Sequence, residues 1–272
     1  MGFLRGLAVV FLAMLIFVSL VASNTLFVFG TSLKYDNVKA GLYPLVQELS
    51  GTGTGNILPQ NITQNVNVNK YVQGALTYVN NYCQNNTDYT FKYNGYSINI
   101  TCDQAKSALN SSNPAEAIIN QSFDSIVSAF YYQNYNCTFT QCFSTINPPT
   151  FLVSQMSQQY FMGKFYLAII VSVILIALLI LAAARKANAV IIIGTLLIAS
   201  GIFVLEFIKI AVSMLGQYSP LLRVFLTTAN TTFLFSLIVG IVLILAGIGL
   251  RIWHKVEDEK KNAKERPKQK KQ

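Results

Sequence analysis

The chain has 272 residues, of which 53% are hydrophobic and only 11% are charged, far below the roughly 25% charged residues of soluble domains. This composition indicates a membrane protein. The net charge of +9 depends strongly on the C-terminal stretch, where nine basic residues from Arg251 onward face four acidic ones. The polar segment 31–160 is nearly neutral, which excludes a nucleic-acid-binding surface there.

The first apolar segment, Leu7–Gly30, is about 36 Å long as a helix, enough for a tilted membrane span. A cleavable signal peptide is the alternative, because small residues at Val21 and Ser23 fit a cleavage site. Leu26–Phe29 continue the apolar run past that site, which favours a retained transmembrane helix within residues 1–30. In both cases the following polar segment lies outside the cytoplasm.

Residues 31–160 are predicted to form a mostly helical, extracytoplasmic domain. Apolar residues recur at helical spacing after Asp36, and again over Val68–Tyr82, where they predict a core-facing stripe. A third helix is predicted to begin after an Asn113 cap, with Pro114 at its first position and a glutamate completing a capping box.

Two interruptions of this helical pattern are predicted. Gly51–Gly55 breaks the chain after the first helix of the domain. Over residues 89–100 the period changes to two around Asn94-Gly95, a strong β-hairpin signal because a type I′ turn needs residues that tolerate positive φ. In this hairpin Tyr93 pairs with Tyr96.

All four cysteines lie in the domain: Cys83, Cys102, Cys137 and Cys142. Their confinement predicts two disulfides in an oxidising compartment, with unpaired structural cysteines as the alternative. A zinc site is disfavoured because the paired C-x2-C spacing is missing and the only histidine, His254, follows the last apolar segment. Of three possible pairings, Cys83 with Cys102 and Cys137 with Cys142 is favoured, because both close short loops.

Seven Asn-x-Ser/Thr motifs are candidate glycosylation sites. Six lie in the polar domain and one in a second outer loop, Gly216–Thr232, and none lies in a predicted cytoplasmic part. Their asparagines are Asn61, Asn85, Asn99, Asn110, Asn120, Asn136 and Asn230.

Three more apolar segments make residues 161–253 a predicted transmembrane block. Its spans are expected at about 165–184, 189–209 and 233–250. The basic residues Arg5, Arg185, Lys186 and Arg251 all fall on one side of this alternation. The positive-inside rule therefore predicts that both termini are cytoplasmic.

The last span and the tail carry two further signals. Ser236, Gly240 and Gly247 lie along one side of the span and predict close contact with another helix, within this protein in preference to a dimer. The basic cytoplasmic tail, residues 254–272, is expected to be disordered. Its charge could attract anionic lipids of the inner leaflet.

Glu206 and Lys209 interrupt the third span. Ionisable residues inside a membrane suggest an ion path or a proton relay. Glu206 lies about 26 Å along the helix from Ala189, near the outer headgroups, and the three-residue spacing lets the two side chains pair on one face. An interfacial ion pair is favoured, and a buried contact or a transport role stays open.

The order of one span, a long outer loop, two spans, a short outer loop and a fourth span resembles the claudin-like layout. The resemblance covers topology, including the extended third span. The tryptophan-containing elements of that family are missing, because Trp253 is the only tryptophan and lies beyond the last span. The chain is therefore not assigned to the family.

No catalytic or cofactor motif is present in the polar domain, which favours a non-enzymatic role without a cofactor or metal. The fold class is therefore a mainly α, four-span membrane protein with a disulfide-stabilised outer domain. We expect a surface glycoprotein of the plasma membrane or a virion envelope, anchored in the lipid bilayer, whose outer domain binds other proteins or itself. The alternative is an accessory or pore-forming subunit of a transport or channel complex.

Overall fold

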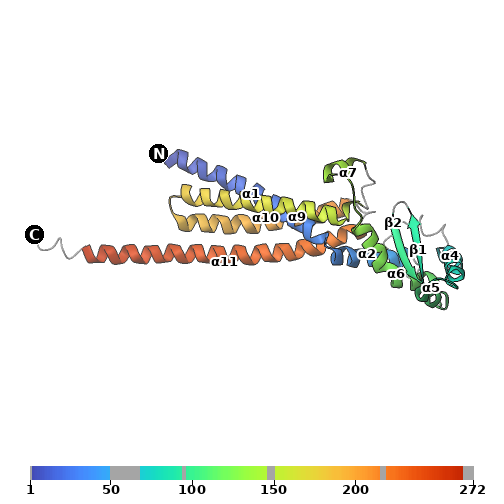
Figure 1. The fold of residues 1–272 in the computed structure, drawn as a ribbon. Helices are drawn as coiled ribbons and strands as arrows, with labels where there is room; N and C mark the ends of the chain where they lie inside the picture. The colour runs from blue at the N-terminus through green and yellow to red at the C-terminus, as the bar shows by residue number, and fades with distance from the viewer. Residues whose placement is uncertain (1, 50–67, 94–95, 146–150, 215–218, 266–272) are drawn as a thin grey trace, which may run out of the picture. The chain divides into compact units, whose positions relative to one another are not determined.

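The computed structural model describes residues 2–49, 68–93, 96–145, 151–214 and 219–265, which are mainly helical (Figure 1). The chain divides into two compact units. The base comprises Met1–Val28, Gly163–Ile208 and Ala229–Gln272, and the head comprises Phe29–Met162 and Lys209–Thr228.

The base is built from four helices that are long and apolar enough to cross a membrane: α1 (Gly2–Ser32), α9 (Gln155–Ala182), α10 (Lys186–Met214) and α11 (Ser219–Glu265). Their candidate spans are Phe3–Ser32, Gln155–Ala182, Lys186–Ala211 and Thr228–Lys260. Within the base the helices run side by side (Figure 1). This arrangement is compatible with the predicted multi-pass membrane protein.

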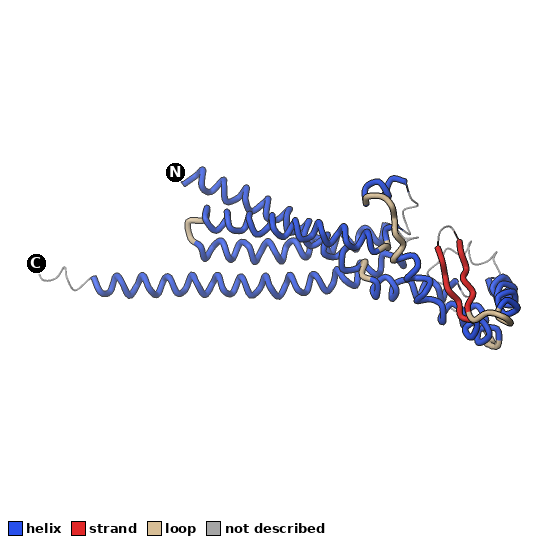
Figure 2. The backbone as a smooth tube through the Cα atoms, viewed as in Figure 1, coloured by secondary structure: helices blue, strands red, loops and turns tan. Residues whose placement is uncertain are grey.

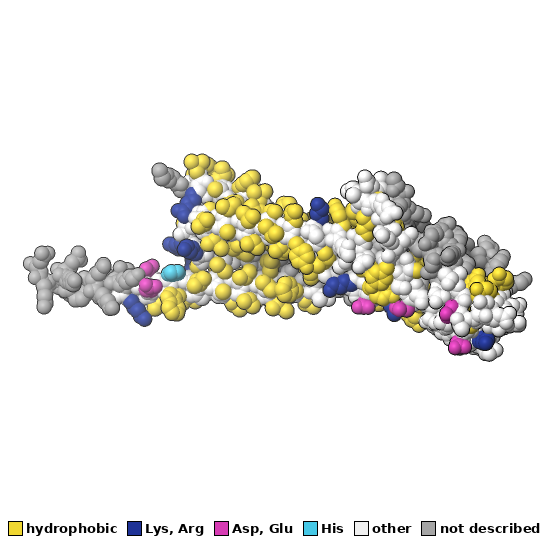
Figure 3. Space-filling view, viewed as in Figure 1, with side chains coloured by type: hydrophobic (Ala, Val, Ile, Leu, Met, Phe, Trp, Pro, Cys, Tyr) yellow, Lys and Arg dark blue, Asp and Glu magenta, His cyan; other side chains and the backbone are white. Residues whose placement is uncertain are grey.

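The base has an apolar cluster in its interior and an apolar outer surface. Ile16 of α1, Leu179 of α9 and Ile193 of α10 are buried in one cluster. Large apolar side chains such as Phe11 and Ile170 are exposed, and hydrophobic side chains cover the visible face of these helices (Figure 3). An exposed apolar surface of this extent marks an interaction site, and around four such helices a bilayer is the fitting environment.

Glycines bring α10 and α11 into backbone contact, as the small residues of the last span predict. A Cβ atom on Gly240 would lie 2.8 Å from the carbonyl oxygen of Gly194. A Cβ on Gly247 would lie 3.1 Å from the carbonyl oxygen of Ala187. The partner helix belongs to this same chain, so the small residues serve packing inside the base.

Between α1 and α9, the described residues of the head form five helices and one hairpin. The elements are α2 (Tyr35–Leu49), α4 (Val68–Tyr82), β1 (Asp88–Tyr93), β2 (Tyr96–Thr101), α5 (Cys102–Leu109), α6 (Pro114–Tyr131) and α7 (Phe139–Thr145). Figure 2 shows the hairpin as the two strands of a helical unit.

The hairpin has the predicted register, with Tyr93 opposite Tyr96. Its base is closed by the disulfide between Cys83 and Cys102, whose Cα atoms are 5.5 Å apart. The second disulfide joins Cys137 to Cys142, with Cα atoms 5.6 Å apart. Both pairings are the ones favoured by loop length.

Among the described residues of the head, two apolar clusters join its helices. The first contains the Cys83–Cys102 bridge and joins α4, α5 and α6 through buried side chains, namely Leu76, Val79, Ala105, Ala108 and Ile118. The second joins α2 to α6 and consists of Leu33, Val38, Phe123, Val127 and Tyr131.

Of two helix starts with capping residues in the sequence, one was predicted and the other was not. The Asn113 side chain accepts a hydrogen bond from the Glu116 backbone N–H, so α6 begins as predicted. Helix α5 was not predicted, although Thr101 and Gln104 form a complete capping box at its start. The core stripe of α4 is also shifted: Leu76 and Val79 are buried with Cys83, whereas Tyr82 is 44% exposed.

The helix that contains the fourth span is longer than predicted at both ends, so two expectations were wrong. Helix α11 begins at Ser219, inside the predicted outer loop, and continues to Glu265, through most of the tail expected to be disordered. Between Pro220 and Pro267 the chain has no proline, and Pro220 lies in the first turn, where a helix tolerates it. The tail also has good helix formers, with Glu257 and Lys261 at a favourable spacing of four.

Several predictions fall outside the described residues. These are the Gly51–Gly55 break, the acceptor Asn61, the Asn94-Gly95 turn, and residues 215–218 and 266–272 of the predicted outer loop and tail.

Candidate functional site

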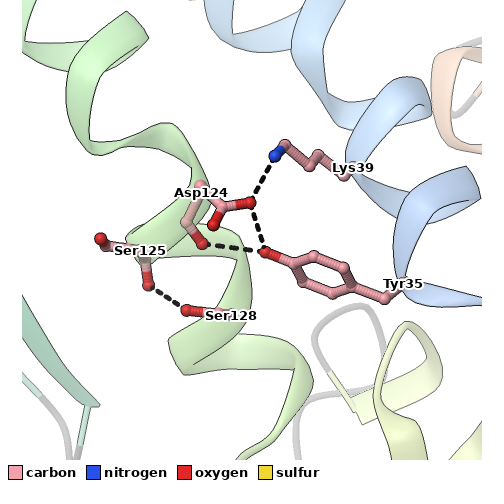
Figure 4. A network of polar contacts seen from close by, with 5 residues as sticks. All are labelled: Tyr35, Lys39, Asp124, Ser125 and Ser128. Atoms are coloured by element: carbon pink, nitrogen blue, oxygen red, sulfur yellow. Dashed lines mark hydrogen bonds and ion pairs between the residues drawn. The ribbon is translucent and has the colours of Figure 1, made fainter.

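Asp124 on α6 is the centre of a polar network that joins α6 to α2 (Figure 4). The Tyr35 hydroxyl donates to the Asp124 carboxylate at 2.8 Å and also contacts the Asp124 carbonyl oxygen at 3.1 Å. Lys39, one turn beyond Tyr35 on α2, forms an ion pair with the same carboxylate oxygen. Three side chains from two helices therefore meet at one atom.

The charges of this network are fixed near neutral pH. The hydrogen bond from Lys39, followed by the one from Tyr35, holds the pKa of Asp124 below its ordinary value. Burial, together with the hydrogen bond to Asp124, raises the pKa of Tyr35 to about 12. Because Asp124 stays ionised and Tyr35 stays protonated, the arrangement acts as a structural link between α2 and α6 and offers no proton relay at physiological pH.

The network predicts an acid-dependent stability. A lowered pKa means that the Asp124 carboxylate stabilises the fold above its unfolded pKa of about 3.9, and that this contribution is lost as the pH falls through the folded value. We expect the unfolding temperature of the wild type to fall more steeply below about pH 4 than that of Asp124→Asn. Thermal unfolding at a series of pH values measures both, and parallel curves would count against the link.

An open groove lies beside this network, between α2 and α6. Its cavity volume is about 490 Å³, and its lining residues are Asp36, Lys39, Ala40, Tyr43, Asn120, Phe123 and Asp124. The Tyr43 hydroxyl donates to the side-chain oxygen of Asn120 at 3.2 Å. The rings of Tyr43 and Phe123 meet edge to face at 5.3 Å. The groove thus has an aromatic side, a charged side and a glycosylation motif.

The described acceptor asparagines are all exposed at the surface. Those in the head are Asn85, Asn99, Asn110, Asn120 and Asn136, and Asn230 lies on α11 in the base. Exposure of the asparagine is what attached sugar requires in a folded protein.

Ser122, the third residue of the Asn120 motif, is 2% exposed and its hydroxyl has no hydrogen-bond partner among the described residues. A buried hydroxyl without a partner costs about 1–3 kcal/mol. We expect Ser122→Ala to raise the free energy of unfolding by about 1 kcal/mol in protein produced without glycosylation. Ser128→Ala is the matched control on α6, because the Ser128 hydroxyl donates to Ser125. Chemical unfolding that shows Ser122→Ala to be destabilising would refute the expectation.

Exposed tyrosines form a second surface on the head. Tyr78 and Tyr82 of α4 are 64% and 44% exposed, and both rings pack edge to face on Tyr89 of β1. Tyr131, in contrast, is buried and its hydroxyl donates to the Leu33 carbonyl. The exposure of Tyr78 was not predicted from the sequence. Its position off the apolar stripe of α4 is the signal that could have indicated it.

No protein-family model, curated protein or solved structure matches this chain. Its function must therefore be inferred from its own geometry. Among the described residues, no group of three histidine, cysteine or acidic side chains is placed to hold a metal ion.

Glu206 and Lys209 both have exposed side chains on α10. Each interacts with a neighbouring group, so neither is isolated. The transport hypothesis stays a prediction. The double change Glu206→Gln with Lys209→Gln tests it, because it should damage an ion path and spare association through the head.

Hydrogen bonds between helices also lie inside the base. Ser19 of α1 and Ser172 of α9 share a hydrogen bond of 2.8 Å, and Asn24 of α1 donates to Ser200 of α10 at 3.0 Å. Ser172 and Ser200 are buried. In a membrane such side chains tie helices together by hydrogen bonding, and each buried hydroxyl here has the partner that a buried polar group needs.

Proposed function

We propose that the protein is a non-enzymatic surface membrane glycoprotein, anchored by its base, whose extracytoplasmic head binds another protein. The partner is a protein in the same or a facing membrane, or a second copy of this chain. The proposed location is the plasma membrane or a virion envelope. The observation that carries the proposal is a head that combines two disulfides with exposed acceptor asparagines.

The charge distribution of the base supports this orientation. Arg5 of α1 donates to the Ala182 carbonyl at the end of α9, at 2.7 Å. Arg185 and Lys186 follow at the turn into α10, and α11 contacts that same turn through Gly247, one helical turn before Arg251. Basic residues of α1, α10, α11 and the turn between α9 and α10 therefore gather at one end of the base, which the positive-inside rule assigns to the cytoplasm.

The proposed contact surface is the pair Tyr78 and Tyr82. Tyrosine is enriched in protein interfaces, because its ring offers apolar area at low conformational cost and its hydroxyl hydrogen-bonds to water or to a partner. The surrounding head is nearly neutral. A partner of matching apolar and hydrogen-bonding character fits this surface better than an anionic polymer.

The proposal is tested by purifying the tagged full-length protein in mild detergent and identifying what co-purifies by mass spectrometry. We expect a stoichiometric protein partner or a defined homo-oligomer, together with sugar on the head. The double change Tyr78→Ser with Tyr82→Ser should lower recovery of the partner about tenfold or more, as loss of an aromatic hot spot does. Thr77→Ala with Asn81→Ala, at exposed positions of α4, is the control and should leave recovery unchanged. A monomer without sugar would contradict the proposal.

A further inference from the structure

We propose that Asn120 carries an N-linked oligosaccharide whose first sugar lies in the groove between α2 and α6, against Tyr43. This inference rests on the proposed function, because the head must meet a glycosylating compartment. It goes further by assigning one modified residue and one occupant to the groove.

The geometry at Asn120 is suited to this attachment. The Tyr43 hydroxyl donates to the side-chain oxygen Oδ1 of Asn120, whereas sugar is attached at the nitrogen Nδ2. Glycosylation therefore leaves this hydrogen bond in place. Since the bond holds the amide beside Tyr43, the first sugar starts next to a ring that is 37% exposed.

The walls of the groove match the two faces of a sugar ring. Tyr43, packed on the buried Phe123, offers an aromatic surface for the C–H face of a sugar. Asp36, Lys39 and the Asp124 carboxylate line the groove with groups that hydrogen-bond to hydroxyls. The volume of about 490 Å³ lies within the roughly 300–1,000 Å³ of small-molecule sites and holds one or two sugar rings. The rest of the oligosaccharide extends into solvent.

The unpartnered hydroxyl of Ser122 is the second observation that points to Asn120. The two residues are two positions apart in α6, so they face about 200° away from each other around the helix. In the unfolded chain, however, Asn120 and Ser122 together form the motif that the glycosylating enzyme reads. The hydroxyl thus has a function before folding and becomes buried without a partner afterwards, which accounts for its place in the core.

The modification is a group transfer from a lipid diphosphate-linked oligosaccharide. The bond between Asn120 Nδ2 and the first sugar carbon forms as the bond from that carbon to the diphosphate breaks. The amide nitrogen loses one proton, and the lipid diphosphate leaves. No atom is oxidised or reduced.

The experiment uses the full-length protein from glycosylating cells, as wild type, Ser122→Ala, Tyr43→Phe and Tyr43→Ser. Site-specific glycopeptide mass spectrometry measures occupancy of each asparagine. A glycan-releasing amidase, applied to the folded protein, measures how fast each sugar chain is removed. We expect sugar on Asn120 in the wild type, lost in Ser122→Ala with the other sites unchanged.

Release from Asn120 should be about tenfold slower than release from Asn110, which does not line the groove, a difference of about 1.4 kcal/mol. Tyr43→Ser should abolish the difference, whereas Tyr43→Phe, which keeps the ring, should retain most of it. Equal release rates from both sites in the wild type would overturn the groove assignment.

The two proposals fail in different ways. If Asn120 is unmodified while Asn85 or Asn110 carries sugar, this inference is wrong and the proposed surface glycoprotein stands. If every acceptor asparagine is unmodified in glycosylating cells, both this inference and the proposed function are wrong.

Discussion

Replacing both Cys83 and Cys102 by alanine should lower the free energy of unfolding of the head by about 3 kcal/mol. The bridge spans 19 residues of sequence, and the chain entropy restored to an unfolded loop of this length corresponds to about that value. It also joins α4 to the start of α5 inside the first apolar cluster. We therefore expect earlier urea unfolding and earlier cleavage by protease in the head.

The matched control is the double replacement of Cys137 and Cys142. This bridge spans only 5 residues, so the same entropy estimate gives about 2 kcal/mol, and α7 lies outside the first cluster. Urea unfolding of the two variants, followed by tyrosine fluorescence and limited proteolysis, compares them directly. A larger loss from the short loop than from the Cys83–Cys102 bridge would contradict our account of the head core.

Gly240→Val should disrupt the base. The added Cβ would lie 2.8 Å from the Gly194 carbonyl oxygen, which is backbone and cannot rotate away, and it would also meet the Ile198 side chain. Overpacking of this kind costs about 1–3 kcal/mol, and we expect the upper end because α10 and α11 must separate to accept the side chain. The measurement is the unfolding temperature of the full-length protein in detergent.

Gly249→Val is the control on the same helix. No atom outside its own helix lies within 4 Å of a Cβ added at Gly249, so the substitution changes helix propensity in the same way without a clash. We expect the Gly249→Val protein to unfold near the wild-type temperature. Equal effects of the two substitutions would show that the Gly194–Gly240 contact does not hold the base together.

The parts of the structure that follow from short-range rules could be predicted from sequence. The register of the hairpin follows from a turn signal and alternation, and it brings Cys83 near Cys102. The four apolar helices follow from length and composition alone. The small residues of α11 predicted a close contact because such residues have few other uses in an apolar helix.

The parts that depend on tertiary contacts could not be predicted. Tyr35 and Asp124 are 89 residues apart, and no local pattern places a phenol from α2 on a carboxylate of α6. The groove at Asn120 arises from the same packing. The ends of α11 were predicted wrongly because polar residues were assigned to the outer loop and the disordered tail. The helix continues through them because no proline interrupts it before Pro267.

The central claim is that the head lies outside and both termini lie inside, and labelling of intact cells tests it most directly. One epitope is inserted at Gly51–Gly55 and a second after Gln272, in the full-length protein. Our account predicts that impermeant antibody labels the first epitope on intact cells and the second only after the membrane is permeabilised. Labelling of the C-terminal epitope on intact cells, or of the head epitope only after permeabilisation, would contradict it.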